Sequence, residues 1–165
     1  MKLETLKDLY IEQLRDLYSA ETQLVQALPK MAAAASHPEL KNSFQMHLEQ
    51  TKQHQDRLST IITRLGAKPD GHKCEAMAGL IKEGQELLKE KGSANPDVLD
   101  AGLIAAAQRV EHYEIAGYGT VRTYAQSLGE QEAMNTLQQT LNEEGETDKK
   151  LTQLAEQVVN PDAQA

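Results

Sequence analysis

The sequence has little cysteine, few aromatic residues and no basic block: its 165 residues include one cysteine, one phenylalanine and no tryptophan. The single cysteine, Cys74, excludes an intrachain disulfide and a cysteine-based zinc site, and we expect it to be an ordinary thiol in a connecting segment. The formal net charge of −8 would repel a phosphate backbone, so no nucleic-acid partner is expected.

Long apolar runs are also missing. No stretch approaches the roughly 18 apolar residues of a membrane span. Glu4 stands where a signal peptide needs an apolar run. We therefore expect a soluble cytoplasmic protein with no membrane partner.

Helix-favouring residues dominate what is present. The chain is 39% hydrophobic and 25% charged, which is typical of a globular protein. Ala, Leu, Glu, Gln and Lys, which favour helix, are abundant. The length suits one domain with a buried core. The sequence thus predicts a single all-α domain over residues 1–165.

Capping and breaking residues divide this domain into five helices. Ser36 offers an N-cap and Asn95-Pro96 another, whereas Gly66 and Gly129 suit helix ends and Asn160-Pro161 follows the last helix. The expected helices span about residues 3–34, 37–65, 74–91, 96–128 and 130–159.

Loop lengths predict how these helices are arranged. Short turns make the first and second helices antiparallel, and likewise the last two. The long connection between the two hairpins, which contains the helix at 74–91, can cross the bundle and start the second hairpin parallel to its predecessor. This is the order of a ferritin-like antiparallel four-helix bundle with a crossover connection that contains a short fifth helix.

The two hairpins also align with each other at one offset of 93 residues. The offset places Leu17 on Val110 and Glu21 on Glu114 without a gap. Apolar agreement between helices can arise by chance, but two glutamates that both interrupt an apolar stripe are a stronger match.

Each of the four long helices carries an apolar stripe that breaks near its middle for polar residues. A carboxylate that faces a core costs several kcal/mol unless something compensates it. Reflection about the two hairpin turns puts all the breaks in one layer. The side chains expected there are Glu21, Thr51, His54, Glu114, Glu144 and Asp148, with Glu111 one turn before Glu114.

Carboxylate and imidazole groups together suit iron or manganese. Ferritin-type sites take one Glu from each of two helices and a Glu-x-x-His pair from each of the other two. Here Glu21 and Glu114 match the single positions. Glu144 is followed by Thr147 instead of His, and His54 is preceded by Thr51 instead of Glu. The prediction is a metal site with an altered ligand set, drawn from Glu21, His54, Glu111, Glu114, Glu144 and Asp148.

Other polar residues have plainer interpretations. We expect His47 and His112 to cap the layer or lie on the surface, and Glu143 and Glu146 to face solvent. The buried carboxylates have an alternative too, because helix tilt could bring them to the surface or to a dimer seam. Gly117 is expected to permit close helix packing.

Several stretches together resemble the YciE/YciF family of ferritin-like, rubrerythrin-related bacterial stress proteins over essentially the whole chain. They are LYSAE at 17–21, HLEQT at 47–51 with His54 and Arg57-Leu58, VEHYE at 110–114 with Gly117-Tyr118, and Glu143-Glu144 with Thr147-Asp148 and Leu151. The resemblance implies a rubrerythrin- or ferritin-like bundle that forms a homodimer, a metal site and a link to general stress responses. It implies no particular reaction.

Three functions compete at this point. The first is a non-haem centre of one or two iron or manganese ions; oxygen or peroxide chemistry would need two metals about 3.5–4 Å apart. The second is a non-enzymatic stress protein that kept the bundle and lost the metal, motivated by Thr51 and Thr147. The third is an interaction module in which the 74–91 helix and a bundle face form the homodimer. Catalytic residues are not assigned.

Overall fold

The computed structural model describes residues 3–165, and every regular element in that part of the chain is a helix. Met1 and Lys2, which the predicted domain includes, lie outside the described residues. The all-α class predicted from the sequence is confirmed. The elements are α1 (Leu6–Ala34), α2 (Pro38–Arg64), α3 (Glu75–Lys89), α4 (Pro96–Ser127), α5 (Gln131–Leu154), the π-helical turn η1 (Ala155–Val159) and α6 (Asn160–Gln164).

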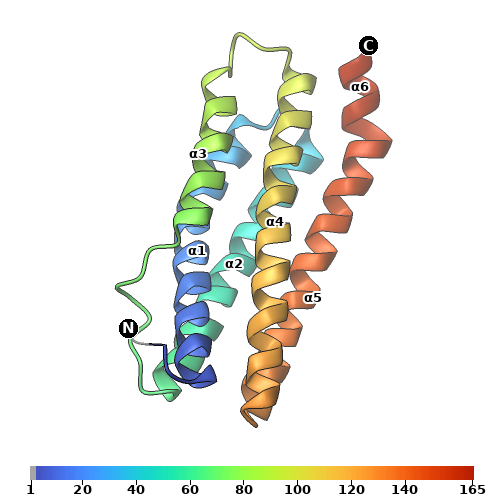
Figure 1. Ribbon diagram of the computed structural model, residues 1–165. Coiled ribbons are helices and arrows are strands. Elements are labelled where there is room, and N and C mark those ends of the chain that lie inside the picture. The colour runs from blue at the N-terminus through green and yellow to red at the C-terminus, as the bar shows by residue number, and fades with distance from the viewer. Residues whose placement is uncertain (1–2) are drawn as a thin grey trace.

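The four long helices form a bundle, with the shorter α3 packed along α1 and α4 (Figure 1). The most extensive contacts join α1 to α2 and α4 to α5, and the pairs α1–α4 and α2–α5 complete the bundle. The chain runs up α1, down α2, up α3, down α4 and up α5 in the view of Figure 1. Helix α4 therefore runs parallel to α2, with α3 in the connection between the two hairpins.

The turn between α1 and α2 is shaped by a distant residue. The sequence predicted Ser36 as the N-cap, but the cap is His37, whose side chain accepts from the backbone N–H of Glu39. The buried carboxylate of Asp100 accepts hydrogen bonds from the backbone N–H groups of Ser36, at 2.9 Å, and His37, at 2.7 Å. This tertiary contact satisfies the free donors of the turn, so Ser36 is not needed as a cap.

The C-terminal segment also differs from the prediction. The last helix was expected to end before Asn160-Pro161, yet the chain stays helical to Gln164 through the π turn at Ala155–Val159. Proline is tolerated in the first turn of a helix, where its missing N–H would have no partner. The π turn resets the hydrogen-bond register so that Pro161 stands in that position of α6.

The core consists of two apolar clusters on either side of a buried polar layer. One contains Leu24, Leu28, Phe44, Leu103 and Leu151, and the other contains Leu14, Leu17, Leu58, Ile62, Val121 and Leu137. Helices α1 and α4 approach closely at Gly117, where an added Cβ would lie 2.7 Å from Cδ2 of Leu17. The expected packing role of Gly117 is confirmed.

Candidate metal centre

Six ionisable side chains from all four long helices meet in the layer between the two apolar clusters. Each exposes 3% of its surface or less; they are Glu21 on α1, His47 and His54 on α2, Glu111 and Glu114 on α4, and Glu144 on α5. Residues three, four or seven apart share a helix face, which is why α2 and α4 each contribute two of them. The structure thus brings together five of the six residues predicted as ligands, and it adds His47.

The six side chains form two groups that share Glu144. One ligand atom from each of His47, Glu111, Glu114 and Glu144 lies within 4.8 Å of the others, and the same holds for Glu21, His54 and Glu144. Such spacing suits oxygen and nitrogen ligands converging on a cation. Among residues 3–165 these are the groups with that geometry.

His54 is held from both sides. Its Nδ1 lies 2.9 Å from Oε1 of Glu144 and 3.5 Å from Oε1 of Glu21, inside the layer. Its Nε2 lies 2.7 Å from Oε2 of Glu143, and that oxygen also accepts a 2.6 Å hydrogen bond from Arg57. A carboxylate on the outer nitrogen of a histidine fixes the ring and directs the inner nitrogen.

The prediction that Glu143 faces solvent is therefore wrong. Its side chain is 22% exposed and is occupied by Arg57 and His54. Partial burial raises the pKa of Glu143, but hydrogen bonds from Arg57, Gln139 and His54 outweigh that effect and lower the pKa to about 2. Glu143 is thus an anion at neutral pH beside His54. Glu146, the other glutamate expected to face solvent, is exposed as predicted.

His47, expected to cap the layer or lie on the surface, is buried within the layer. Its Nε2 is 3.1 Å from Oε1 of Glu111 and 4.0 Å from Oε2 of Glu144. Burial lowers the pKa of His47, but Glu111 and Glu144 outweigh it and raise the pKa to about 9. For His54 burial acts the same way, and Glu144 with Glu21 raises the pKa to about 10. In contrast, the side chain of His112 is 69% exposed.

Four carboxyl groups face these two imidazoles, so with every carboxyl ionised the layer would carry more negative than positive charge. Burial raises the pKa of Glu111 to about 7. Burial also raises the pKa of Glu21, which accepts a hydrogen bond from Tyr118. Burial raises the pKa of Glu144 as well, but contacts with His54 and His47 outweigh it, and the net shift is downward.

Among the described residues, Glu114 is the carboxyl of the layer that pairs with neither histidine. It is fully buried, and neither carboxylate oxygen has a hydrogen-bond partner. Burial, together with the charges of Glu21, Glu144 and Glu111, raises its pKa well above the ordinary value. In an interior where buried polar groups are nearly always paired, two unpartnered oxygens on one side chain point to a group that binds them.

Two threonines stand where the ferritin pattern has ligands. Thr51 is fully buried in the layer, and its hydroxyl has no partner. Thr147 is 7% exposed and donates to the backbone oxygen of Glu143 at 3.1 Å. Most other helical threonines of the chain make the same bond one turn back, as Thr22, Thr60 and Thr136 do.

Asp148 does not join either group, so its predicted place among the ligands is corrected. Thr147 takes the inward position, and one step along a helix turns the next side chain by about 100°. The Asp148 carboxylate instead accepts a 3.0 Å hydrogen bond from Gln108 and lies 3.4 Å from His112.

The missed residues differ in how far the sequence could have revealed them. His47 precedes Thr51 by four residues and His54 by seven, so all three share one face of α2, and this spacing was a usable signal. Glu143 gave none, because its role depends on Arg57 and His54 of another helix. Cys74, expected to be an ordinary thiol, is buried at the start of α3 with its sulfur 3.1 Å from the Tyr113 hydroxyl.

Comparisons with known proteins agree on the family. Residues 5–164 match the family described as a domain of unknown function, DUF892. Protein YciF of Escherichia coli K12 is 45% identical over 165 residues, which cover 99% of this chain and 98% of that protein.

Solved structures agree on the fold. The crystal structure of the E. coli stress protein YciF matches with a TM-score of 0.90 at 45% identity, covering 96% of this chain and 99% of that one. YcfI of Rhodopseudomonas palustris matches with a TM-score of 0.86 at 43% identity, covering 92% and 95%. A Xanthomonas campestris protein, 22% identical with a TM-score of 0.78 and 95% of each chain covered, shares the fold. Within the described residues, no helix is both long and apolar enough to cross a bilayer.

Proposed function

The chain belongs to the DUF892 family and is a homologue of the stress protein YciF, and from its buried polar layer we propose that it is a ferritin-like metal-binding protein of the bacterial stress response. The order of the four long helices, with α2 and α4 parallel and a crossover between them, supports the ferritin-like description. The description of YciF as a stress protein supports the physiological role.

Glu114 carries the proposal. A buried carboxyl with two unpartnered oxygens destabilises a protein by several kcal/mol unless it binds something. Its neighbours in the layer are acids and imidazoles, so a bound cation would satisfy both oxygens, whereas a proton shared with Glu21 would satisfy only one. A divalent ion would also offset the excess of carboxylates in the layer.

The donor set fits iron or manganese. Four carboxyls and two imidazoles supply oxygen and nitrogen ligands, and no thiol lies among them. We assign one ion to His47, Glu111, Glu114 and Glu144, and a second to Glu21, His54 and Glu144, which would make Glu144 the shared ligand. A pair of redox-active ions would supply electrons for reaction with oxygen or peroxide. Asp148 has no part in this assignment.

The chain's own residues have definable roles around the ions. The Glu143–Arg57 pair holds Nε2 of His54, so that Nδ1 faces the layer. Tyr118 donates to Glu21 and leaves the other oxygen of that carboxylate, Oε2, unpartnered. The apolar clusters above and below exclude water, and the buried hydroxyl of Thr51 has no hydrogen-bond partner.

A second function is favoured by one observation. Thr147 satisfies its hydroxyl on its own helix and offers nothing to the layer, so one ligand position of the ferritin pattern is closed. A stress protein that kept the bundle and lost metal chemistry would show this. It would contain little metal, and its melting temperature would not respond to Fe(II) or Mn(II).

We also propose a homodimer. In α3, Met77 is the one fully buried residue, while Leu80, Ile81, Leu87 and Leu88 are only partly covered by the bundle. This apolar face, together with the neighbouring bundle surface, would be covered in a dimer.

Elemental analysis separates the two functions. The protein would be purified without chelators from cells grown with added iron and manganese, alongside the double variant Glu114→Ala/Glu144→Ala. The metal-binding function predicts one or two ions per chain in the wild type, near none in the double variant, and a melting temperature that rises by several degrees on adding Mn(II). A metal-free wild type with an unchanged melting temperature would favour the second function.

A further inference from the structure

We propose that a groove between α2 and α5 is the path by which a divalent cation reaches the buried layer, with Thr147 setting its width and Lys150 slowing the ion at its rim. The proposal rests on the metal-binding function above and adds to it the route and the residues that control it.

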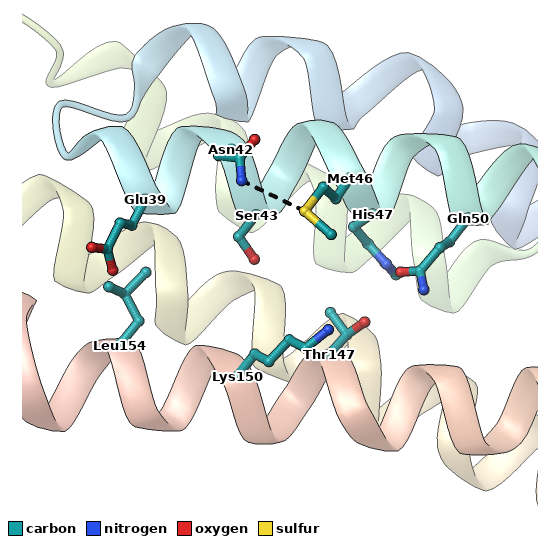
Figure 2. A pocket seen from close by; sticks show the side chains of 9 residues that line it. All are labelled: Glu39, Asn42, Ser43, Met46, His47, Gln50, Thr147, Lys150 and Leu154. Atoms are coloured by element: carbon teal, nitrogen blue, oxygen red, sulfur yellow. Dashed lines mark hydrogen bonds between the residues drawn. The ribbon is translucent and has the colours of Figure 1, made fainter.

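The groove has a volume of about 310 Å³ and runs along the seam of the two helices (Figure 2). Exposed residues form its rim, among them Asn42, Met46 and Lys150. Its floor contains His47 and Thr147, which are only 3% and 7% exposed. His47 belongs to the layer, so the floor of the groove is the edge of the candidate metal centre.

A smaller cavity of about 10 Å³ adjoins the same floor. Ser43, His47 and Thr147 line both the groove and this cavity, and Glu111 lines the cavity but not the groove. Three side chains therefore separate solvent from the carboxylate of a proposed ligand. A histidine at position 147, as in the ferritin pattern, would fill much more of this space than threonine does.

The seam between α2 and α5 is closed beside His54 and open beside His47. His54 lies seven positions after His47 on α2, and Lys150 lies seven positions after Glu143 on the antiparallel α5, so Lys150 faces His47 as Glu143 faces His54. Glu143 binds His54 and is covered by Arg57. Lys150 cannot accept a hydrogen bond from an imidazole, and among residues 3–165 no carboxylate pairs with it.

The charge of Lys150 also bears on the rate of loading. A cation moving along the groove passes the Lys150 ammonium, drawn towards Thr147 in Figure 2, before it meets the acidic layer. Charges along an approach path change association rates more than final affinity, and salt screens the effect. Lys150→Glu should therefore speed loading without changing the number of bound ions.

Stopped-flow absorption with Co(II) as the probe ion tests this claim. We expect Lys150→Glu to load about two- to tenfold faster than wild type at low salt, with the difference shrinking at high salt. Lys149→Glu is the matched control, because it makes the same charge change on an exposed neighbour that does not line the groove. Equal acceleration by both variants, or none by Lys150→Glu, would overturn the role of Lys150.

The width of the path is tested by two substitutions at its floor. Thr147→Leu should load more than about tenfold slower, since the longer side chain obstructs the floor, whereas Thr147→Val keeps the shape and should load at the wild-type rate. Loading of Thr147→Leu at the wild-type rate would show that ions take another path. A wild type that takes up no Co(II) would instead overturn the metal-binding function itself.

A cysteine introduced at the floor of the groove tests whether the path is open without the use of metal. The variant Thr147→Cys would be treated with a thiol reagent under native conditions, with the fully buried Cys74 of the same chain as internal control. An open groove predicts that Cys introduced at 147 reacts at least about a hundredfold faster than Cys74. Equal, slow reaction of both thiols would overturn the path even if the protein binds metal.

Discussion

At the scale of single residues, Glu114 shows how a cation-binding site lowers the stability of the metal-free protein. Its carboxyl is buried among other acids without a hydrogen bond, although its helix position would suit an apolar side chain. Natural proteins keep such groups where function needs them and lose stability in return.

Glu114→Leu should therefore stabilise the metal-free protein while it abolishes metal binding. Removing an unpartnered buried carboxyl in favour of an apolar side chain of similar size should raise the free energy of unfolding by about 1–3 kcal/mol. Urea unfolding in the presence of a chelator measures this. Glu146→Leu, on the exposed face of α5, is the control and should change stability by less than about 0.5 kcal/mol. A destabilised Glu114→Leu would mean that the carboxyl has a structural partner.

Metal binding should release protons at neutral pH. The pKa values of His47, about 9, and His54, about 10, lie above 7, so both imidazoles carry a proton in the metal-free protein that coordination must displace. Protons compete less as pH rises, so the apparent affinity should increase between pH 6 and 9. Calorimetry with Mn(II) in buffers of different ionisation enthalpy should report the release of about two or more protons. Binding without proton release would exclude both histidines as ligands.

A residue of the layer could be predicted when the pattern of its own helix determines that it points inward. Glu21, Glu114 and Glu144 interrupt their own apolar stripes, so each was recognisable from its own helix. Asp148 was placed wrongly as a substitute for Thr147, which the ferritin pattern had already put at the ligand position; its carboxylate accepts from Gln108 of α4 instead.

At the scale of elements, the helices follow from apolar periodicity, while their ends depend on contacts that periodicity does not contain. Asp100 in α4 shapes the turn before α2, and the two lie more than 60 residues apart. The π turn before α6 shifts the hydrogen-bond register, and Pro161 therefore stands in the first turn of α6. Local capping rules therefore found each helix and misplaced some ends.

Gly117 and Gly119 of α4 allow the effect of helix propensity on stability to be measured apart from the effect of packing. An added Cβ at Gly119 would meet nothing within 4 Å, so Gly119→Ala should raise the free energy of unfolding by about 0.5–1 kcal/mol. At Gly117 the same change places Cβ against the buried Leu17, and overpacking by about 1–3 kcal/mol should cancel or exceed that gain. Thermal unfolding of the two single variants measures both. Equal stabilisation by both would show that α1 and α4 do not need the close approach.

At the scale of the whole molecule, reflecting the helices about their turns placed the four polar breaks at one height, and the structure has them in one layer. This succeeded because antiparallel helices joined by short turns leave little freedom in relative height. The groove could not be foreseen in this way, since it arises from how two sequence-distant helices meet.

The partly exposed apolar face of α3 leads to a prediction about the oligomeric state. Light scattering should give a mass about twice that of the 18.2 kDa chain, because the partly exposed leucines and isoleucine of α3 would be buried between two copies. The variant Leu80→Glu/Leu87→Glu should shift the protein towards the monomer and leave metal content unchanged, since α3 contributes nothing to the layer. A strict wild-type monomer would contradict the homodimer.

Anaerobic titration with Fe(II) tests most directly whether the buried layer binds metal. The wild type should show saturable binding at one or two equivalents per chain, and Glu114→Ala/Glu144→Ala should lose it, because that variant removes both the unpartnered carboxyl and the carboxyl common to the two ligand groups. No binding by the wild type, or unaltered binding by the double variant, would contradict the account.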